Sequence, residues 1–357
     1  MMRLFFIGVI LLSAVVDVAA DPIYTETLPT LRQPVSNNAV ALVSTEQGDY
    51  LYSFLGLGAG KTWQDTSLEA SVLEPGADSW TILEPVPGAS GRLAASAVSA
   101  DGAAWVFGGY TVAADGSEKS IPGVYRVRPG KPRLQWVTDM PVPVEDSVIL
   151  VYQDRYIYLV SGWHDLGNVN LVQVLDTKSM SWTQATPWPG DPVFGHSGGI
   201  SDDRMLLCDG VRIQYPADDS PRAFLPASQC WSGRIDAENY RRIHWRSITA
   251  HPGAGRYRMA ATGDTNQRVV FAGGSVNPYN FNGTGYNGVP AETEKSVFSY
   301  SFKSDQWQQH GELKQGTMDH RGLPYSNGWY YLLGGMQDQQ TVVAEVYRFS
   351  LDASVKP

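Results

Sequence analysis

One hydrophobic pattern recurs six times along the chain: an aromatic and aliphatic run that ends in glycine. The runs occupy residues 50–58, 104–109, 156–162, 205–210, 269–274 and 329–335. Their last glycines are residues 58, 109, 162, 210, 274 and 335, so successive glycines are 48 to 64 residues apart. A short apolar run that stops at glycine is typical of a buried β-strand, and a period of about 50 residues is typical of a propeller blade.

Tryptophan marks a second position in the first five repeats. These residues are Trp80, Trp136, Trp182, Trp245 and Trp307. The two landmarks predict four strands per repeat. A small-residue strand such as LAASAV from Leu93 comes first, and the glycine-ended strand comes second. An alternating strand such as VYRV from Val124 is third, and the fourth begins at the tryptophan.

The sixth repeat lacks a fourth strand, and the missing strand is found at the other end of the chain. Residues 24–34, YTETLPTLRQP, carry the Leu-Pro and Arg that follow fourth strands elsewhere. Pairing this segment into the last blade would close the ring and protect its edges. The pattern, which resembles the kelch repeat, predicts an all-β, six-bladed kelch-type β-propeller closed by the N-terminal strand. A β-sandwich would not explain the period.

The first 20 residues have the features of a secretory signal peptide. Arg3 precedes an apolar stretch at residues 4–16, and Val18, Ala19 and Ala20 are small residues suited to a cleavage site. The stretch is shorter than the roughly 20 residues that span a bilayer. We therefore predict a signal peptide at residues 1–20, one propeller domain at residues 21–357, and a periplasmic or secreted protein.

The amino-acid composition argues against some classes of binding partner. The net charge is −9 and no Lys/Arg cluster is present in the sequence, which argues against nucleic acid and anionic membranes as partners. Cys208 and Cys230 could pair in an exported chain, closing a loop that would stabilise the fold by roughly 3 kcal/mol. The alternative is two unpaired thiols.

Polar residues just before each innermost strand are expected to face the mouth of the channel, because every blade enters it in the same way. They are Asn37, Asn38, Arg92, Glu145, Asp146, His196, Arg256, Arg258, His320 and Arg321. Loops after the glycines should surround the same mouth and add Trp63, Trp163, Arg212, Tyr279 and Tyr286.

This mixture suits a carbohydrate, which needs convergent hydrogen bonds and a flat apolar surface. Arginine pairs bidentately with carboxylates, so Arg92, Arg212, Arg256 and Arg321 suggest an anionic sugar. The same arginines and tryptophans could instead pack the blades together. No metal or other cofactor is expected.

The chain resembles the kelch-type sialic-acid mutarotases, the family of N-acetylneuraminate epimerase and its cyclically permuted relatives. The resemblance is carried by GLGAGKTW at residues 56–63, SAVSADGAAWVFGG at 96–109, VVFAGG at 269–274 with its Asn/Tyr-rich insertion, and GELKQG at 311–316. It implies an exported propeller that interconverts the anomers of an acidic sugar without a metal. In that family an acid and an arginine follow the fourth-blade glycine, whereas here Asp209 precedes Gly210 and Arg212 follows it.

Mutarotation needs one group to take the anomeric hydroxyl proton and another to protonate the ring oxygen. Glu145 or Asp146 is the candidate base, and His196 or His320 is the candidate proton donor. Two alternatives remain open: a non-catalytic propeller that binds a glycan or a protein, and a copper enzyme of the galactose-oxidase type.

Overall fold

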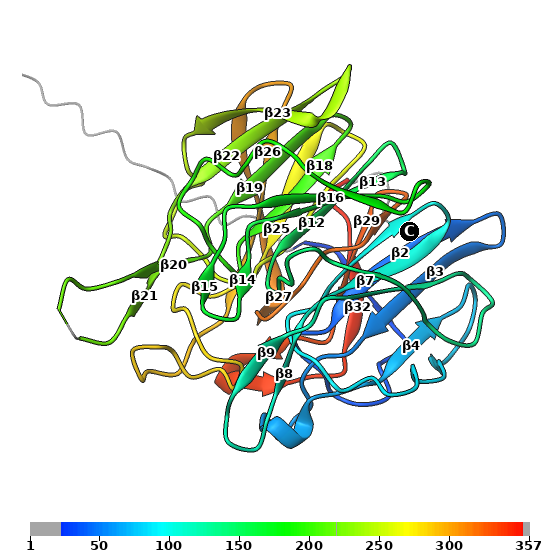
Figure 1. The fold of residues 1–357 in the computed structure, drawn as a ribbon. Helices are drawn as coiled ribbons and strands as arrows, with labels where there is room; N and C mark the ends of the chain where they lie inside the picture. The colour runs from blue at the N-terminus through cyan, green and yellow to red at the C-terminus, as the bar shows by residue number, and fades with distance from the viewer. Residues whose placement is uncertain (1–22, 219, 353–357) are drawn as a thin grey trace, which may run out of the picture.

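Six four-stranded antiparallel sheets surround a central channel in the computed structural model, which describes residues 23–218 and 220–352 (Figure 1). Each sheet is one blade, and its first strand faces the channel. The second strands are buried on both faces because neighbouring blades stack on either side of them. This explains why they are continuous apolar runs: all five residues of β7 (Ala103–Phe107) are buried.

The first three blades each follow the chain outward from the channel. Blade one contains β2 (Ala39–Thr45), β3 (Gly48–Phe54), β4 (Ala70–Leu73) and β5 (Thr81–Ile82). Blade two contains β6 (Ser96–Ala100), β7, β10 (Gly123–Val127) and β11 (Gln135–Asp139). Blade three contains β12 (Val148–Tyr152), β13 (Tyr156–Val160), β16 (Val172–Asp176) and β17 (Ser181–Gln184).

The last three blades keep this order. Blade four contains β18 (Ser197–Ser201), β19 (Arg204–Cys208), β22 (Cys230–Asp236) and β23 (Asn239–Ile248). Blade five contains β24 (Ala260–Gly263), β25 (Arg268–Ala272), β26 (Glu294–Ser301) and β27 (Gln306–Thr317). Blade six contains β28 (Tyr325–Ser326), β29 (Trp329–Leu333), β32 (Val346–Phe349) and β1 (Thr25–Leu28).

The N-terminal strand closes the ring, as predicted. β1 pairs antiparallel with β32, from Thr25 opposite Phe349 to Leu28 opposite Val346. An ion pair between Glu26 and Arg348 (2.8 Å) supports this pairing. The predicted six-bladed, all-β propeller is therefore confirmed. The predicted signal peptide lies outside the described residues.

Loops between the second and third strands form small hairpins on one face of the ring. They are β8 (Tyr110–Val112) with β9 (Glu118–Ser120), β14 (Trp163–His164) with β15 (Gly167–Asn168), β20 (Val211–Gln214) with β21 (Ala223–Pro226), and β30 (Met336–Gln337) with β31 (Thr341–Val342). Two 3-10 turns, Trp63–Asp65 and Asp338–Gln340, belong to the same set of loops. The first three hairpins extend toward the lower left of Figure 1. We call this side of the ring the loop face.

Every blade enters the channel through the same left-handed turn. The turn residues have φ between 53° and 68° and are Asn37, Ala94, Asp146, Gly195, Arg258 and Asp319. The residue before each turn forms a β-bridge with a residue that directly follows a glycine after the second strand, as Glu145 does with Trp163. In blade one that glycine is Gly56 rather than Gly58, because the bridge joins Ser36 to Leu57. Glycine is required in blade four, because a Cβ on Gly195 would lie 1.9 Å from the Tyr257 ring. In blade two the bridge and turn take up Leu93 and Ala94, so β6 begins later than predicted.

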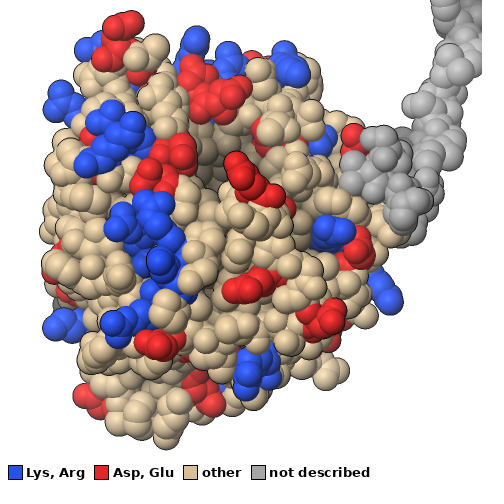
Figure 2. Space-filling view, turned by 90° about the vertical axis from the view of Figure 1, so that its right-hand side faces the viewer, with Lys and Arg blue, Asp and Glu red and all other residues tan. Residues whose placement is uncertain are grey.

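Acidic and basic side chains are close together on the surface shown in Figure 2. Lys and Arg side chains form a connected patch there although they are not clustered in the sequence, and acidic side chains lie beside it. The surface is hollowed between acidic side chains in the upper part of the view. Within the described ranges, no helix has the length and apolar character needed to cross a membrane.

Candidate functional site

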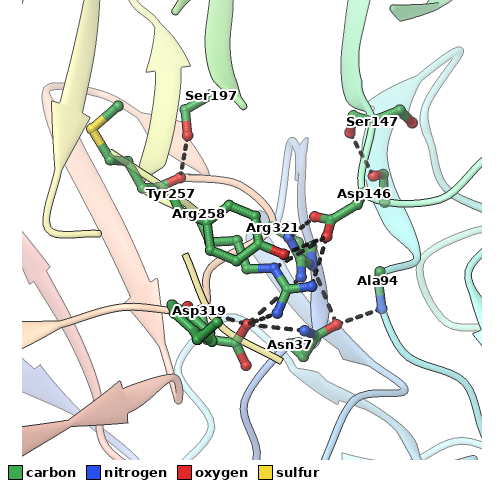
Figure 3. A network of polar contacts seen from close by, with 12 residues as sticks. Asn37, Ala94, Asp146, Ser147, Ser197, Tyr257, Arg258, Asp319 and Arg321 are labelled. Atoms are coloured by element: carbon green, nitrogen blue, oxygen red, sulfur yellow. Dashed lines mark hydrogen bonds and ion pairs between the residues drawn. The ribbon is translucent and has the colours of Figure 1, made fainter. Parts of the chain in front are cut away.

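The left-handed turns bring charged side chains together where the six blades meet. Figure 3 shows Asp146, Arg258, Asp319 and Arg321 facing one another, with Asn37 beside them. The turns are linked by backbone hydrogen bonds from blade to blade. For example, Gly195 N–H donates to the Asp146 carbonyl (2.9 Å), and Arg258 N–H donates to the Gly195 carbonyl (2.8 Å).

Asp146, Arg258, Asp319 and Arg321 form what we call the charged quartet. Arg258 donates to Asp146 through Nη2 (2.6 Å) and Nε (3.1 Å) and to Asp319 through Nη1 (2.9 Å). Arg321 donates to Asp146 and lies 3.6 Å from Asp319. The four side chains are almost completely buried, and each carboxylate contacts both guanidinium groups. Their charges therefore balance within the quartet.

The quartet keeps Asp146 ionised. Burial by itself would raise the pKa of Asp146, but the charges of Arg258 and Arg321 outweigh it and lower the pKa. The carboxylate also accepts a hydrogen bond from the Tyr257 hydroxyl (3.3 Å). With its oxygens committed to these donors, Asp146 is poorly placed to act as the general base that the sequence suggested.

A cavity of about 270 Å³ opens over the quartet on the loop face; we call it the Glu145 cavity. Its charged lining residues are Glu118, Glu145, Asp146, Arg222 and Arg258. Its other lining residues are mainly aromatic: Tyr110, Trp163, Phe194, Phe224, Asn280, Phe281 and Tyr286. The predicted residues Glu145, Asp146, Trp163 and Tyr286 thus meet in one cavity.

Glu145 is the unusual acid of this cavity. The residue is buried, and its Oε2 atom has no hydrogen-bond partner within the described part of the chain. Burial raises the pKa of Glu145 well above its ordinary value, although the Ser120 hydroxyl opposes this. Nearby Asp146, Glu118 and Asp165 raise it further. The surroundings of Glu145 therefore favour its neutral, protonated form over the carboxylate.

Glu118 and Arg222 come to the cavity from different hairpins. Loss of surrounding water raises the pKa of Glu118, while the charges of Arg258 and Arg222 act in the opposite direction. Arg222 donates to the Leu166 carbonyl (3.0 Å) and lies over the rings of Trp163 (4.9 Å) and Phe224 (5.3 Å). Among the described residues, no carboxylate lies within ion-pair distance of Arg222, in contrast to Arg258.

The aromatic wall of the cavity is packed rather than loose. Phe224 and Tyr286 stack with their ring centroids 4.2 Å apart, and Trp163 meets Phe194 edge to face at 5.4 Å. Phe194 also packs edge to face on Tyr257. Flat apolar faces next to carboxyl and guanidinium groups provide the two kinds of contact that a sugar ring requires.

His196 and His320 are not in the Glu145 cavity. They belong to the lining of a separate cavity of about 260 Å³ along the first strands, which we call the channel cavity. Burial lowers the pKa of each histidine to about 4. His320 Nε2 is hydrogen-bonded to the Thr317 hydroxyl (2.6 Å), and neither ring nitrogen of His196 has a hydrogen-bond partner in the described structure. Both are neutral at pH 7, so neither is a ready proton donor there.

Arg92 and Arg256 lie outside the cavity, because both side chains turn back into their blades. Arg92 donates to the Gly108 carbonyl (3.0 Å) and lies over the Tyr125 ring (4.8 Å). Arg256 does the same with the Gly273 carbonyl (3.2 Å) and the Phe298 ring (5.3 Å). These two arginines therefore pack the blades, which is the alternative that the sequence left open.

The other predicted binding residues are dispersed. Arg321 belongs to the charged quartet, and Arg212 lines a different cavity on the loop face. Trp63 is exposed on a 3-10 turn and does not line the Glu145 cavity. Tyr279 is fully buried, and its hydroxyl lies 3.5 Å from Asp319, so it supports the quartet from beneath the surface.

Cys208 and Cys230 form a disulfide, which settles the pairing that the sequence left open. They are direct partners on β19 and β22, at the base of the β20–β21 hairpin. As for metals, the described ranges contain no group of three or more His, Cys, Asp or Glu residues that could hold an ion.

Several residues of the cavity were given no role from the sequence. Glu118, Arg222 and Phe224 lie in loops of irregular length, so the repeat gives no landmark for them. Arg258 was placed at the channel rim without a role. An alignment of the left-handed turns would have matched Arg258 and Asp319 with Asp146, and opposite charges at equivalent positions of a closed ring indicate a buried network.

No family model matches the chain, and no curated protein matches it in sequence. Among solved structures, that of YjhT is similar with a TM-score of 0.70 and 17% sequence identity, over 90% of this chain and 96% of that chain. At this identity the similarity concerns the fold alone. It supports a six-bladed propeller as the architecture of this chain.

Proposed function

We propose that this protein is an exported sugar mutarotase that interconverts the anomers of an acidic sugar, such as sialic acid, in the Glu145 cavity. The observation that carries the proposal is a buried Glu145 with an unpartnered Oε2 atom in an aromatic cavity. The same cavity also contains a second carboxyl, Glu118, and an arginine, Arg222, that has no carboxylate partner among the described residues. Export rests on the N-terminal apolar segment, and the acidic substrate class rests on the family resemblance together with Arg222.

The proposed reaction uses the two glutamates as acid and base. Glu145 gives its proton to the ring oxygen as the bond between that oxygen and the anomeric carbon breaks. Glu118 accepts the proton of the anomeric hydroxyl, whose O–H electron pair forms the new carbonyl bond. After rotation about the adjacent C–C bond, the hydroxyl attacks the other face of the carbonyl. Both protons then return, so each carboxyl regains its starting state.

The remaining groups would hold the substrate. Arg222 has N–H groups beyond the one bonded to Leu166, and these can bind the sugar's carboxylate in a bidentate manner. Trp163 and Phe224 line the cavity beside Arg222, so the ring carbons of a sugar bound by Arg222 would lie next to these aromatic side chains. The charged quartet would form the floor and contribute no net charge.

The test is an NMR anomer-exchange assay on N-acetylneuraminic acid, with glucuronic acid and glucose as comparison sugars. We expect the parent protein to accelerate exchange of the acidic sugar, and Glu145→Gln to lower that rate by about 10²- to 10⁴-fold while the sugar still binds. Glu118→Gln should have a similar effect. Glu84→Gln, which alters an exposed carboxylate paired with Arg133, is the matched control and should leave the rate unchanged.

Two outcomes would contradict the proposal. If the parent binds the sugar without accelerating exchange, the protein is a glycan-binding module, the non-catalytic alternative. If Glu145→Gln and Glu84→Gln exchange anomers as fast as the parent, the acid is elsewhere.

A further inference from the structure

A second cavity of about 220 Å³ lies on the loop face and is separate from the Glu145 cavity. It is lined by Asn168, Asp191, Pro192, Arg212, Ile213 and Tyr215. We call it the Tyr215 cavity. It contains an aromatic ring, a guanidinium, a carboxylate and an amide, which is the same set of chemical groups that lines the Glu145 cavity.

The two cavities flank the same pair of hairpins. In β14–β15, Trp163 of the Glu145 cavity is the direct cross-strand partner of Asn168 of the Tyr215 cavity. In β20–β21, Phe224 and Ile213 are related in the same way. Cross-strand partners are only about 4.5–5.5 Å apart, so the cavities are separated by little more than the width of a hairpin.

The base of the Tyr215 cavity is fixed by hydrogen bonds. Asn168 Nδ2 donates to the carbonyls of Pro192 and Val211, at 2.9 Å each, and so ties β15 to the Asp191 loop and to β20. The Asp191 loop is held in turn by Gln229, which accepts from the Asp191 N–H (3.1 Å) and donates to its carbonyl (3.0 Å). A cavity with a fixed base can bind a ligand at a low cost in ordering.

The polar and aromatic side chains around the opening make few strong contacts with the rest of the protein. Arg212 and Asp191 lie 3.8 Å apart; the Asp191 side chain is exposed and that of Arg212 is partly exposed, which makes a weak, solvent-screened pair. Tyr215 is 65% exposed although it is a large aromatic residue. Its hydroxyl rests against Gly167, where an added Cβ would lie 2.8 Å away, so the ring has a defined position on the β14–β15 turn.

We propose that the Tyr215 cavity is a second sugar subsite and that the substrate therefore contains at least two sugar units. The reducing unit would occupy the Glu145 cavity. The next unit would cross the hairpin tips and stack on Tyr215, with Arg212 and Asp191 bonding its polar groups. This inference rests on the proposed function, because it assumes that the first unit binds beside Glu145.

The experiment compares N-acetylneuraminic acid with its reducing α2,8-linked dimer by isothermal titration calorimetry and the anomer-exchange assay. The parent should bind the dimer about tenfold or more tightly than the monomer. Tyr215→Ala and Arg212→Ala should each remove most of that advantage and change monomer affinity by less than about twofold. Tyr215→Phe, which keeps the ring, should retain the stacking contribution. Trp136→Ala is the matched control, since Trp136 is also an exposed aromatic residue but lies on an outer strand.

The subsite is refuted if the parent binds both sugars equally, if Tyr215→Ala weakens both sugars alike, or if Trp136→Ala has the same effect. If the parent does not exchange monomer anomers but binds the dimer in a Tyr215-dependent way, the proposed function is wrong and the subsite stands. If the parent binds neither sugar, both proposals fail.

Discussion

Glu145 and Asp146 are neighbours in the chain, yet their pKa values shift in opposite directions. Asp146 faces the guanidinium groups of Arg258 and Arg321, which favour its ionised form. Glu145 is buried beside other carboxyls, so its neutral form is favoured. The left-handed turn at Asp146 produces this difference, because it sends the two side chains into different surroundings. One carboxyl holds the ring together while the other is available as an acid.

At this scale we predict that Asp146→Asn strongly destabilises the fold. The change leaves two buried guanidinium groups without half of their counter-charge, which typically costs about 3–5 kcal/mol. Asp101→Asn, which removes an exposed partner of Arg128, should cost at most about 1 kcal/mol. Urea unfolding at pH 7 measures both, and equal losses would show that the quartet adds no stability.

The same prediction has a pH dependence with a definite sign. Because the pKa of Asp146 is lower in the folded protein, its stabilising contribution is present above the ordinary aspartate value of 3.8 and is lost as pH falls through the folded value. The stability gap between the parent and Asp146→Asn should therefore narrow below about pH 4. A gap that is constant from pH 7 to pH 3 would contradict it.

At the scale of elements, the blades are regular, and the hairpins on the loop face supply many of the residues that line the Glu145 and Tyr215 cavities. The β20–β21 hairpin brings Phe224 to the Glu145 cavity and Ile213 to the Tyr215 cavity, with Arg222 just before β21. Its base is the Cys208–Cys230 disulfide. The cross-link joins the two neighbouring strands from which the hairpin projects, so it stabilises blade four at the point where the hairpin begins.

We predict that Cys208→Ala/Cys230→Ala lowers the free energy of unfolding by about 3 kcal/mol, the value expected for closing a loop of 22 residues. The parent treated with a reductant under denaturing conditions and then refolded with the reductant present should show the same loss. The double variant should not respond to the reductant. Mass spectrometry of the unreduced protein should find the linked peptides, and two alkylatable thiols would rule the bond out.

For the molecule as a whole, the fold could be predicted from the sequence because a propeller is a repeat. Each buried second strand has to be apolar and to end in a tight turn, so the glycine landmarks count the blades. The sixth repeat lacks a fourth strand, and residues 24–34 resemble the segment that follows fourth strands elsewhere. Together these two features predict that β1 closes the ring. The hairpins between the second and third strands differ in length. The spacing between successive glycine landmarks is therefore uneven, although the number of blades is unaffected.

The site was only partly predictable, because side-chain direction depends on the offset from each left-handed turn. Residues at the turn itself, such as Asp146 and Arg258, face one another where the blades meet. Residues two positions earlier, Arg92 and Arg256, turn back to their own blade's glycine carbonyls. A sequence pattern shows that all of these lie near the rim but not where they point. Arg222 lies in a hairpin outside the repeat, so no periodic signal could have found it.

Closure of the ring by β1 predicts that a short N-terminal deletion will affect the whole molecule. Removing residues 24–34 would expose the edge of β32 and also the core around Leu31, which is 5% exposed and packs between blades one and six. We expect a lower, broader thermal transition, because blades one and six would be joined only through their inner strands.

If the deleted protein does not fold, Leu31→Ala gives a graded test. It should cost about 2–5 kcal/mol, whereas Leu166→Ala, at a leucine that is 82% exposed, should cost no more than about 0.5 kcal/mol. An unchanged melting temperature in the deletion variant, or equal effects of the two leucine changes, would show that the propeller does not depend on its N-terminal strand.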